Sequence, residues 1–206
     1  MDPTYDREGN RKYVNEVERR RFLRAAKATG SPSVFTFCLV LARTGARISE
    51  VLALTPRRID IDGQAIVYRS LKKRVKEGDD PVYRAVPVTA RLLRRLEEVH
   101  QIKAPQQDPD RVDEPIWPWC RRTAWARVKE VFDAADVSGA QATPKGFRHG
   151  FAVNALVQKV PLPIVQEWLG HSNLEMTARY CKAVAAEARA IANQMWGWRL
   201  RLGLRW

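Results

Sequence analysis

The stretch "VFTFCLVLARTGARISEVLALTP", residues 34–56, decides the fold. Its first part carries apolar side chains on every face, which is typical of a helix buried at the centre of a domain. Gly45 then predicts a turn, and residues 46–56 predict a short helix that Pro56 ends. The sequence therefore indicates a helical domain built around one central helix.

Capping signals and apolar periodicity predict further helices on both sides of this stretch. Asn15, with Glu18 three residues later, indicates a first helix of about four turns. Thr89 is the expected cap of a later helix, and Thr143 followed by Pro144 begins another. The predicted helices span residues 15–30, 89–102, 121–135, 143–158 and 162–170.

A small sheet is predicted between these helices. Residues 59–63, 64–70 and 82–88 form short runs rich in β-branched and aromatic side chains. The basic segment "LKKRVKEGDD" (71–80) separates the last two runs and predicts an exposed turn. The expected fold class is therefore mainly α with a small antiparallel sheet (α+β). Residues 103–115 form the only long loop, either a flexible boundary or a surface excursion.

The composition is that of an ordinary globular chain with a strong excess of positive charge. The 206 residues are 45% hydrophobic, which is enough for one well-buried domain or at most two small ones. Lys and Arg number 36 against 23 Asp and Glu, giving a formal net charge of +13. Because such a field attracts polyanions, nucleic acid is the expected partner class.

The cysteines and the N-terminus exclude several other classes. Cys38, Cys120 and Cys181 are odd in number and far apart, so neither a disulfide framework nor a zinc site is indicated. The N-terminus lacks the apolar core of a signal peptide, and no segment reaches the ~20 apolar residues that cross a bilayer. We expect a cytoplasmic protein that does not bind a membrane.

The stretch "LGHSNLEMTARY" (169–180) places a histidine, a helix start and a tyrosine close together. Ser172 and Glu175 form a capping box, so a helix is expected to begin at about Asn173. His171 then stays on the preceding turn, and Tyr180 lies two turns inside the helix. A continuous helix would place the two rings on opposite faces, so the helix must bend or the tyrosine must swing in.

Four segments taken together resemble the catalytic domain of the tyrosine recombinases, the phage integrase family. They are "TGARISEVLAL" (44–54), the basic turn at 71–80, "TPKGFRHGFA" (143–152) and "LGHSNLEMTARY". The resemblance covers nearly the whole chain and implies that catalytic-domain fold over residues 1–196. Fewer than 45 residues precede "TGARISE", so we expect no separate N-terminal core-binding domain, either in a natural single-domain protein or in a fragment. For the tail, 197–206, we expect either docking on a neighbouring protomer or packing at home.

The resemblance also assigns the active-site positions, which are Arg47, Lys72, Lys145, Arg148, His171 and Tyr180. Tyr180 is the implied nucleophile, and Lys73 is an alternative to Lys72 as the lysine of the turn. Glu50 matches the family's supporting acid. Lys145 stands where the family usually has histidine. For His149 we favour a structural role over a catalytic one.

These residue types suit the reaction that the resemblance implies. The tyrosine attacks a DNA phosphodiester and forms a 3′-phosphotyrosine link, while two planar, permanently charged guanidinium groups bind the phosphate oxygens. His171 or Lys145 is the candidate acceptor of the phenolic proton, and Lys72 the donor to the departing 5′ oxygen. No metal and no cofactor is required.

The implied function is a site-specific DNA recombinase of the integrase or resolvase type. Its expected partners are double-stranded DNA and further copies of the chain, as a tetramer on DNA and a monomer or dimer in free solution. One alternative is a catalytically weakened accessory DNA-binding protein, to which Lys145 points; another is a type IB-like topoisomerase. In a purely structural reading, Arg47 and Glu50 form an ordinary helix pair and Arg148 merely binds a backbone phosphate.

Overall fold

The computed structural model describes residues 4–70 and 81–181. Its elements are the helices α1 (Glu16–Ala28), α2 (Pro32–Thr44), α3 (Ile48–Leu52), α4 (Ala90–His100), α5 (Lys103–Gln106), α6 (Arg121–Ala134), α7 (Pro144–Val157), α8 (Leu162–Leu169) and α9 (Leu174–Ala178), the 3-10 turn η1 (Pro56–Arg58), and the strands β1 (Ile59–Asp60), β2 (Ala65–Arg69) and β3 (Tyr83–Pro87). The predicted fold class, mainly α with a small antiparallel sheet, is confirmed.

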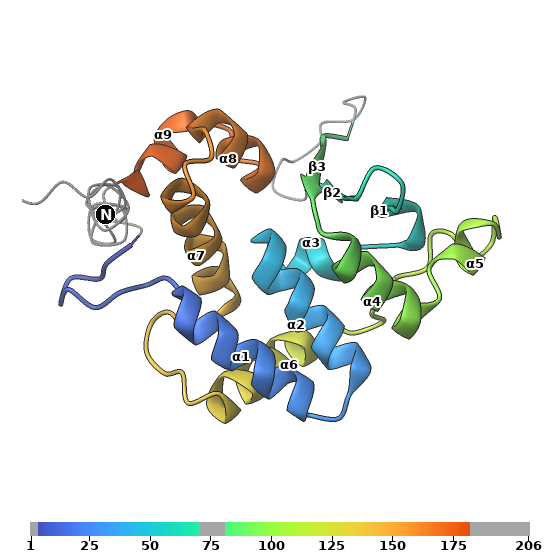
Figure 1. The fold of residues 1–206 in the computed structure, drawn as a ribbon, viewed down its shortest axis with the longest axis horizontal. Coiled ribbons are helices and arrows are strands. Elements are labelled where there is room, and N and C mark those ends of the chain that lie inside the picture. Colours follow the sequence, from blue (N-terminus) through green and yellow to red (C-terminus); the bar gives the residue numbers. More distant parts are fainter. Residues whose placement is uncertain (1–3, 71–80, 182–206) are drawn as a thin grey trace, which may run out of the picture.

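Helix α2 lies at the centre of the molecule, as the opening stretch predicts. It packs against α1, α4 and α7 (Figure 1). Phe37, Val40 and Leu41 on α2 are fully buried. The helix ends at Gly45, whose φ of 63° is left-handed, and a Cβ there would lie 2.8 Å from the Phe151 side chain of α7. Glycine is therefore required both by the turn and by the close approach of α7.

The three strands form one antiparallel sheet in the order β1-β2-β3. Ile66 pairs with Val86, and Tyr68 pairs with Arg84. The Tyr68 side chain is buried, and its hydroxyl donates a hydrogen bond to Thr44 Oγ1 at the end of α2 (2.9 Å). This contact joins the sheet to the central helix at the corner where α3 begins.

The helix caps predicted from the sequence are largely confirmed. Asn15 and Glu18 form the reciprocal capping box of α1, Thr89 caps α4, and Thr143 caps α7 with Pro144 in the first turn. Gly170 ends α8 in the left-handed conformation.

The cap predicted for the last described helix is wrong by one residue. Asn173, not Ser172, is the N-cap of α9, and its side chain accepts from the Glu175 backbone N–H (2.8 Å). Asparagine is as good a cap as serine, so the sequence did not separate the two positions. The helix ends at Ala178, and Tyr180 therefore follows the helix in a turn instead of lying two turns inside it.

The long loop, residues 103–115, is a surface excursion that packs back on the domain and is not a flexible boundary. It contains α5, and Pro105 and Val112 are buried. The Gln106 side chain donates to the carbonyls of Pro56 and Ile59 (3.0 and 2.7 Å). Within residues 4–70 and 81–181, no helix combines the length and the hydrophobicity needed to cross a bilayer.

Candidate active site

Arg47 occupies the turn between α2 and α3 and is held there by Glu50. The Glu50 carboxylate accepts the Arg47 backbone N–H (2.8 Å) and one guanidinium N–H (2.6 Å). The Glu50 side chain is only 1% exposed, whereas that of Arg47 is 28% exposed. The expected pair of helix neighbours is therefore present, and it leaves the guanidinium of Arg47 partly accessible.

A second arginine, which the sequence analysis missed, completes this ion-pair network. Arg84 on β3 is buried and donates to both carboxylate oxygens of Glu50 (3.2 and 2.7 Å). Its Nε donates to the carbonyl of Trp168 at the end of α8 (2.8 Å). Arg84 thus ties the sheet to both α3 and α8.

The alternation of side chains along a strand could have predicted that Arg84 is buried. Residues alternate between exposed and buried along β3, and Arg84 takes a buried position between the exposed Tyr83 and Ala85. A buried arginine needs hydrogen-bond acceptors, and a carboxylate is the strongest of them. Burial raises the pKa of Glu50, but the hydrogen bonds and charge of Arg84, together with Arg47, outweigh it and leave that pKa lowered. The carboxylate is therefore ionised at neutral pH.

Arg148 on α7 is buried against the ends of two other helices. Its Nη1 donates to the carbonyl of Gly45 (3.1 Å), and its Nη2 donates to the carbonyl of Leu169. These carbonyls close α2 and α8, where the helix dipoles favour a cation. Burial, reinforced by the charge of Arg47, lowers the pKa of Arg148 to about 9, so the group stays protonated at neutral pH.

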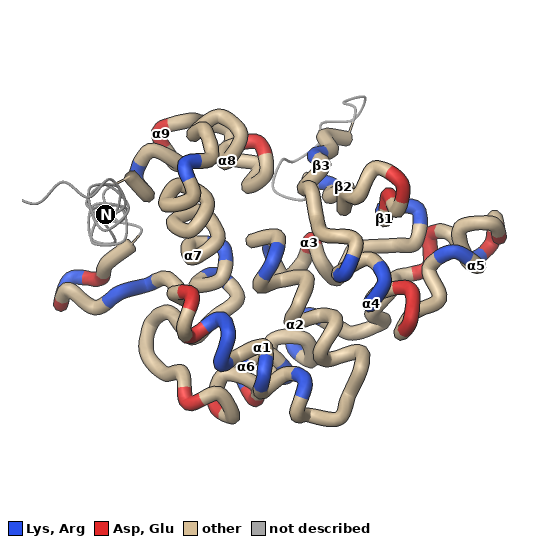
Figure 2. Tube along the Cα trace, viewed as in Figure 1, with Lys and Arg blue, Asp and Glu red and all other residues tan. Residues whose placement is uncertain are grey.

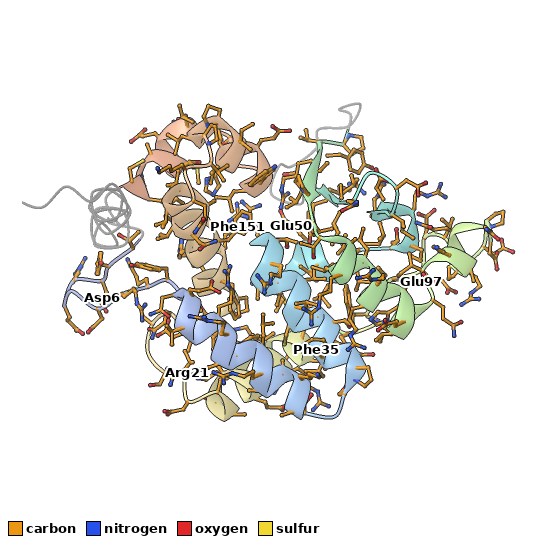
Figure 3. The ribbon with its side chains drawn as sticks, in the orientation of Figure 1. Asp6, Arg21, Phe35, Glu50, Glu97 and Phe151 are labelled. Carbon is orange, nitrogen blue, oxygen red and sulfur yellow. The ribbon has the colours of Figure 1, made fainter. Side chains whose placement is uncertain are left out.

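Figure 3 shows where this site lies in the molecule. Glu50 on α3 and Phe151 on α7 are labelled near the middle of the molecule, where α7 meets the corner between α2 and α3. Arg148 lies one turn before Phe151 on α7. The site is therefore formed where α3, α7, α8 and β3 converge.

Tyr180 is buried beside two imidazole rings. Its hydroxyl lies 2.6 Å from Nδ1 of His149, and its ring stacks on that of His171 at a centroid distance of 6.3 Å. The residue is only 3% exposed. Burial raises the pKa of Tyr180, and the charges of Arg148 and Arg47 offset part of that rise. Both arginines therefore act electrostatically on the phenol.

The chain brings His171 and Tyr180 to the same side by changing direction between them. Gly170 ends α8, and α9 has only five residues, so no continuous helix joins the two rings. His171 is also fixed by Thr177, whose Oγ1 lies 2.9 Å from the His171 Nδ1. The expectation was that the helix must bend or the tyrosine must swing in, and the structure shows a break in the helix before α9.

The sequence favoured a structural role for His149, but the structure places its ring in contact with the Tyr180 hydroxyl. Burial, followed by the charges of Lys145 and Arg148, lowers the pKa of His149 to about 4. The ring is therefore neutral near pH 7, so its Nδ1 can accept a hydrogen bond from the Tyr180 hydroxyl, while the lowered pKa makes the imidazole a weak base. The contact joins residues 31 positions apart, so spacing in the sequence gave no sign of it.

Of the predicted lysines, one is exposed and acts on the cluster only through its charge on His149, and the others lie outside the described residues. Lys145 is exposed in the first turn of α7 and makes no hydrogen bond or ion pair with the described residues. Lys72 and Lys73 lie in residues 71–80, outside the part of the chain that the structure describes. The structure thus gathers Arg47, Arg148, His171 and Tyr180, with Glu50 behind Arg47.

The fold and the arrangement of these side chains define a class, the catalytic domains of tyrosine recombinases. A crystal structure of XerA recombinase has a TM-score of 0.64 at 24% identity, covering 82% of this chain and 59% of that chain. XerH recombinase bound to palindromic difH substrate, in a post-cleavage complex, has a TM-score of 0.68 at 20% identity, covering 94% and 56%. At these identities the likeness establishes the fold.

Sequence comparison identifies the family. Residues 12–187 match the model of the phage integrase family, and the chain therefore belongs to that family. Tyrosine recombinase XerD of Proteus mirabilis is 30% identical over 161 residues, covering 75% of this chain and 49% of the relative. Tyrosine recombinase XerA of Thermococcus kodakarensis is 31% identical over 153 residues, covering 73% and 51%. The chain spans about half the length of these relatives.

Proposed function

We propose that this chain is a site-specific DNA recombinase domain that cuts and rejoins double-stranded DNA through Tyr180. One observation carries the proposal. A buried tyrosine hydroxyl lies against the Nδ1 of a neutral histidine and within the electrostatic reach of two arginines. Such a cluster provides a nucleophile, a proton acceptor and a binding site for a phosphate.

The two arginines bind the non-bridging oxygens of the scissile phosphate. A guanidinium has five N–H donors, and Arg148 uses two of them on the carbonyls of Gly45 and Leu169. The rest remain for the phosphate, as do the N–H groups of Arg47 that do not bind Glu50. Removing one preorganised donor of this kind typically costs about 3–4 kcal/mol of transition-state stabilisation.

His149 accepts the phenolic proton as Tyr180 attacks. A bond forms between the tyrosine oxygen and phosphorus, and the bond from phosphorus to the 5′ oxygen breaks, which leaves a 3′-phosphotyrosine and a 5′-hydroxyl. Lys72 supplies the proton to the departing oxygen. Strand joining reverses these steps, with the 5′-hydroxyl of a second strand as nucleophile. The sequence favoured His171 or Lys145 as acceptor; the 2.6 Å contact favours His149.

The proposed substrate and assembly follow from charge and from similar proteins. The net charge of +13 suits a polyanion, and XerH recombinase was solved bound to difH substrate in a pre-cleavage complex. We propose a tetramer on DNA, with a monomer or dimer in free solution, acting in the cytoplasm. Residues 197–206, whose docking on a neighbouring protomer is part of this proposal, lie outside the described residues.

Trapping of a covalent protein–DNA adduct tests the proposal. The protein is incubated with a pool of randomised duplexes that carry a single nick, so that the short cleaved product diffuses away and the 3′ link persists. Wild type forms an adduct that survives detergent, and Tyr180→Phe forms none while still binding DNA. Tyr83→Phe, which changes an exposed tyrosine of β3, retains adduct formation and serves as the matched control.

The other outcomes identify the alternatives. Tight DNA binding without an adduct in any duplex would contradict the proposal and favour an accessory DNA-binding protein. Relaxation of a supercoiled plasmid by wild type, without a preferred sequence among the adducts, would favour a topoisomerase.

A further inference from the structure

A long groove with a different lining from that of the candidate active site crosses the molecule and reaches Phe151, one turn after Arg148 on α7. Its volume is about 1410 Å³, and residues of α1, α2 and α4 line it. Figure 1 shows how these three helices are arranged. Apolar side chains line its floor, among them Leu23 of α1, Phe35 and Leu39 of α2, and Phe151 of α7. None of the candidate catalytic residues in the described part of the chain lines it. We refer to it as the basic groove, for the reason that follows.

Helix α1 provides one basic wall. Arg19, Arg20, Arg24 and Lys27 recur at helical spacing on the face of α1 that lines the groove. Arg19 and Arg20 share Glu16 as an ion-pair partner. Arg24 and Lys27 are exposed and form no ion pair with any described residue. Positive charge on this wall is therefore only partly compensated.

Helix α4 provides the opposite wall. Arg91, Arg94 and Arg95 line the groove there, and Figure 2 shows basic positions on both α1 and α4. Arg95 forms an ion pair with Glu98 (2.8 Å) and also lies over the ring of Phe35 (5.6 Å). Among the described residues that line the groove, Glu98 is the single acidic one. Arg91 and Arg94 have no acidic partner among the described residues.

The cations of the groove disfavour one another. Arg43 at the end of α2 also lines the groove. Burial lowers the pKa of Arg19, and the charge of Arg43 lowers it further, whereas Glu16 opposes this change. The Nε of Arg19 is buried and has no hydrogen-bond partner. An anionic occupant would relieve this repulsion between the cations that line the groove.

The shape and the floor of the groove decide which anion fits. Its basic walls on α1 and α4 and its apolar floor on α2 suit an elongated anion that also carries apolar groups, such as an acidic amphipathic helix. A duplex would place phosphates on the rim and leave the apolar floor uncovered. An amphipathic helix covers such a floor with its apolar face.

We propose that the basic groove binds an acidic amphipathic helix of a partner protein. The apolar face of that helix packs on Leu39 and Phe35, while its carboxylates bind the arginines of the two walls. The tail of a second copy does not suit the groove, because residues 197–206 contain three arginines and no acid. The proposal concerns a surface apart from the proposed strand cleavage and stands independently of it.

A synthetic helix tests the groove directly. The probe is a fluorescent peptide of 21 residues with leucine on one helical face and glutamate elsewhere, and the control is a scrambled peptide of the same composition. Both are titrated with the full chain at physiological salt and followed by anisotropy. We expect the amphipathic peptide to bind at least about tenfold more tightly than the scrambled one, because only it can bury the apolar floor.

Charge-reversal variants locate the binding. The double variant Arg24→Glu with Arg94→Glu changes one exposed residue on each wall, and we expect at least about tenfold weaker peptide binding. The matched double variant Arg121→Glu with Arg122→Glu changes exposed residues of α6 outside the groove and leaves binding unchanged. Leu39→Gln keeps every charge and weakens binding through the floor alone. Circular dichroism and thermal melting confirm that each variant folds.

Three results would overturn the proposal. Equal binding of the amphipathic and scrambled peptides, or equal weakening by the two double variants, would show general charge attraction only. Weaker binding of a 30-base-pair duplex to the groove variant, with peptide binding unchanged, would make the groove a DNA-binding surface instead.

Discussion

Two arginines share one buried carboxylate behind the proposed phosphate site. Glu50 is 1% exposed, and Arg84 is 6% exposed at its side chain. Arg84 does not reach the accessible side of the cluster; it holds Glu50, and Glu50 in turn holds Arg47. The orientation of Arg47 therefore depends on a residue from a different element.

Breaking the buried pair should cost far more than breaking an exposed one. Arg84→Met leaves part of the Glu50 carboxylate unpaired, and we expect the free energy of unfolding to fall by about 3–5 kcal/mol. Arg95→Met makes the same chemical change at a pair that is 41% and 59% exposed, and should cost about 0–1 kcal/mol. Urea denaturation of both variants measures the difference. Similar losses in the two would contradict the role of Arg84.

His149 makes stability depend on pH in the acid range. Its pKa is lowered from 6.5 to about 4, so the unfolded state binds more protons than the folded state between these values. The free energy of unfolding should therefore fall as the pH drops from about 6.5 to 4, by up to about 3 kcal/mol for this one group.

Substitution separates this contribution from that of a second histidine. Burial also lowers the pKa of His100 to about 4, so His149→Asn should remove only part of the acid dependence. The double variant with His100→Asn should remove both parts. Thermal unfolding from pH 4 to 8 measures the slopes, and an unchanged slope in His149→Asn would show that His149 titrates normally in the folded protein.

Side chains that meet across elements were the hardest to predict from the sequence. Arg47, Arg148 and Tyr180 were recognised from short segments that resemble a family. The Arg84–Glu50 and His149–Tyr180 contacts were not predicted, because each joins distant segments through packing alone.

At the scale of elements, local signals predicted most boundaries because caps are local interactions. The box at Asn15 and the cap at Thr143 require only residues within one turn. The same locality explains the error before α9, where Ser172 and Asn173 are both good caps and the packing of α8 against α9 selects one. The sequence did not predict whether residues 103–115 pack on the domain, because this packing depends on hydrogen bonds to distant backbone carbonyls near η1.

Helix α7 contacts the N-terminal segment by direct backbone packing. The Val14 N–H donates to the carbonyl of Gly146 (3.0 Å), and a Cβ on Gly150 would lie 2.1 Å from the Val14 carbonyl oxygen. Alanine is the better helix former by about 1 kcal/mol. Glycine at position 150 therefore permits the close approach at a cost in helix propensity.

Gly150→Ala should destabilise the protein, although alanine has the higher helix propensity. The new methyl group must push residues 13 and 14 away from α7, and we expect a loss of about 1–3 kcal/mol, as for an overpacked core. Because Tyr13 packs in the same cluster as Tyr180, the adduct yield should fall as well. A melting temperature at or above that of wild type would show that the backbone at Val14 can move away from α7 without loss of stability.

The segment that carries Tyr180 must move if the tyrosine is to reach a phosphodiester. Tyr180 is 3% exposed, whereas Cys181 beside it is exposed. Cys38 is buried, so in a Cys120→Ser background an environment-sensitive thiol dye reacts at Cys181. We expect its emission to change on titration with a duplex.

A label elsewhere provides the comparison. The same dye on Ser138→Cys, in a background with Cys120→Ser and Cys181→Ser, reports on an exposed position between α6 and α7. Its emission should change little. Equal changes at both positions, or none at either, would argue against a movement confined to the segment after α9.

At the scale of the whole molecule, the excess of positive charge sets the strength of DNA binding. The formal net charge of +13 comes from residues spread over most of the chain. Counterions released from DNA make such binding fall steeply with salt, and each phosphate contact adds about 0.9 to the slope of log affinity against log salt concentration. The slope therefore counts the cations that contact phosphate.

Arg47 provides a test of whether the site itself contacts the backbone of DNA. Its side chain is 28% exposed beside Glu50. If it binds a phosphate, Arg47→Ala should reduce the slope by about 1, and Tyr180→Phe, which removes no charge, should leave it unchanged. Anisotropy titrations of a labelled duplex between about 50 and 200 mM salt measure both. An unchanged slope in Arg47→Ala would mean that Arg47 serves only its ion pair with Glu50. The phosphate would then have to be held by Arg148 and by groups that the ion-pair network does not include.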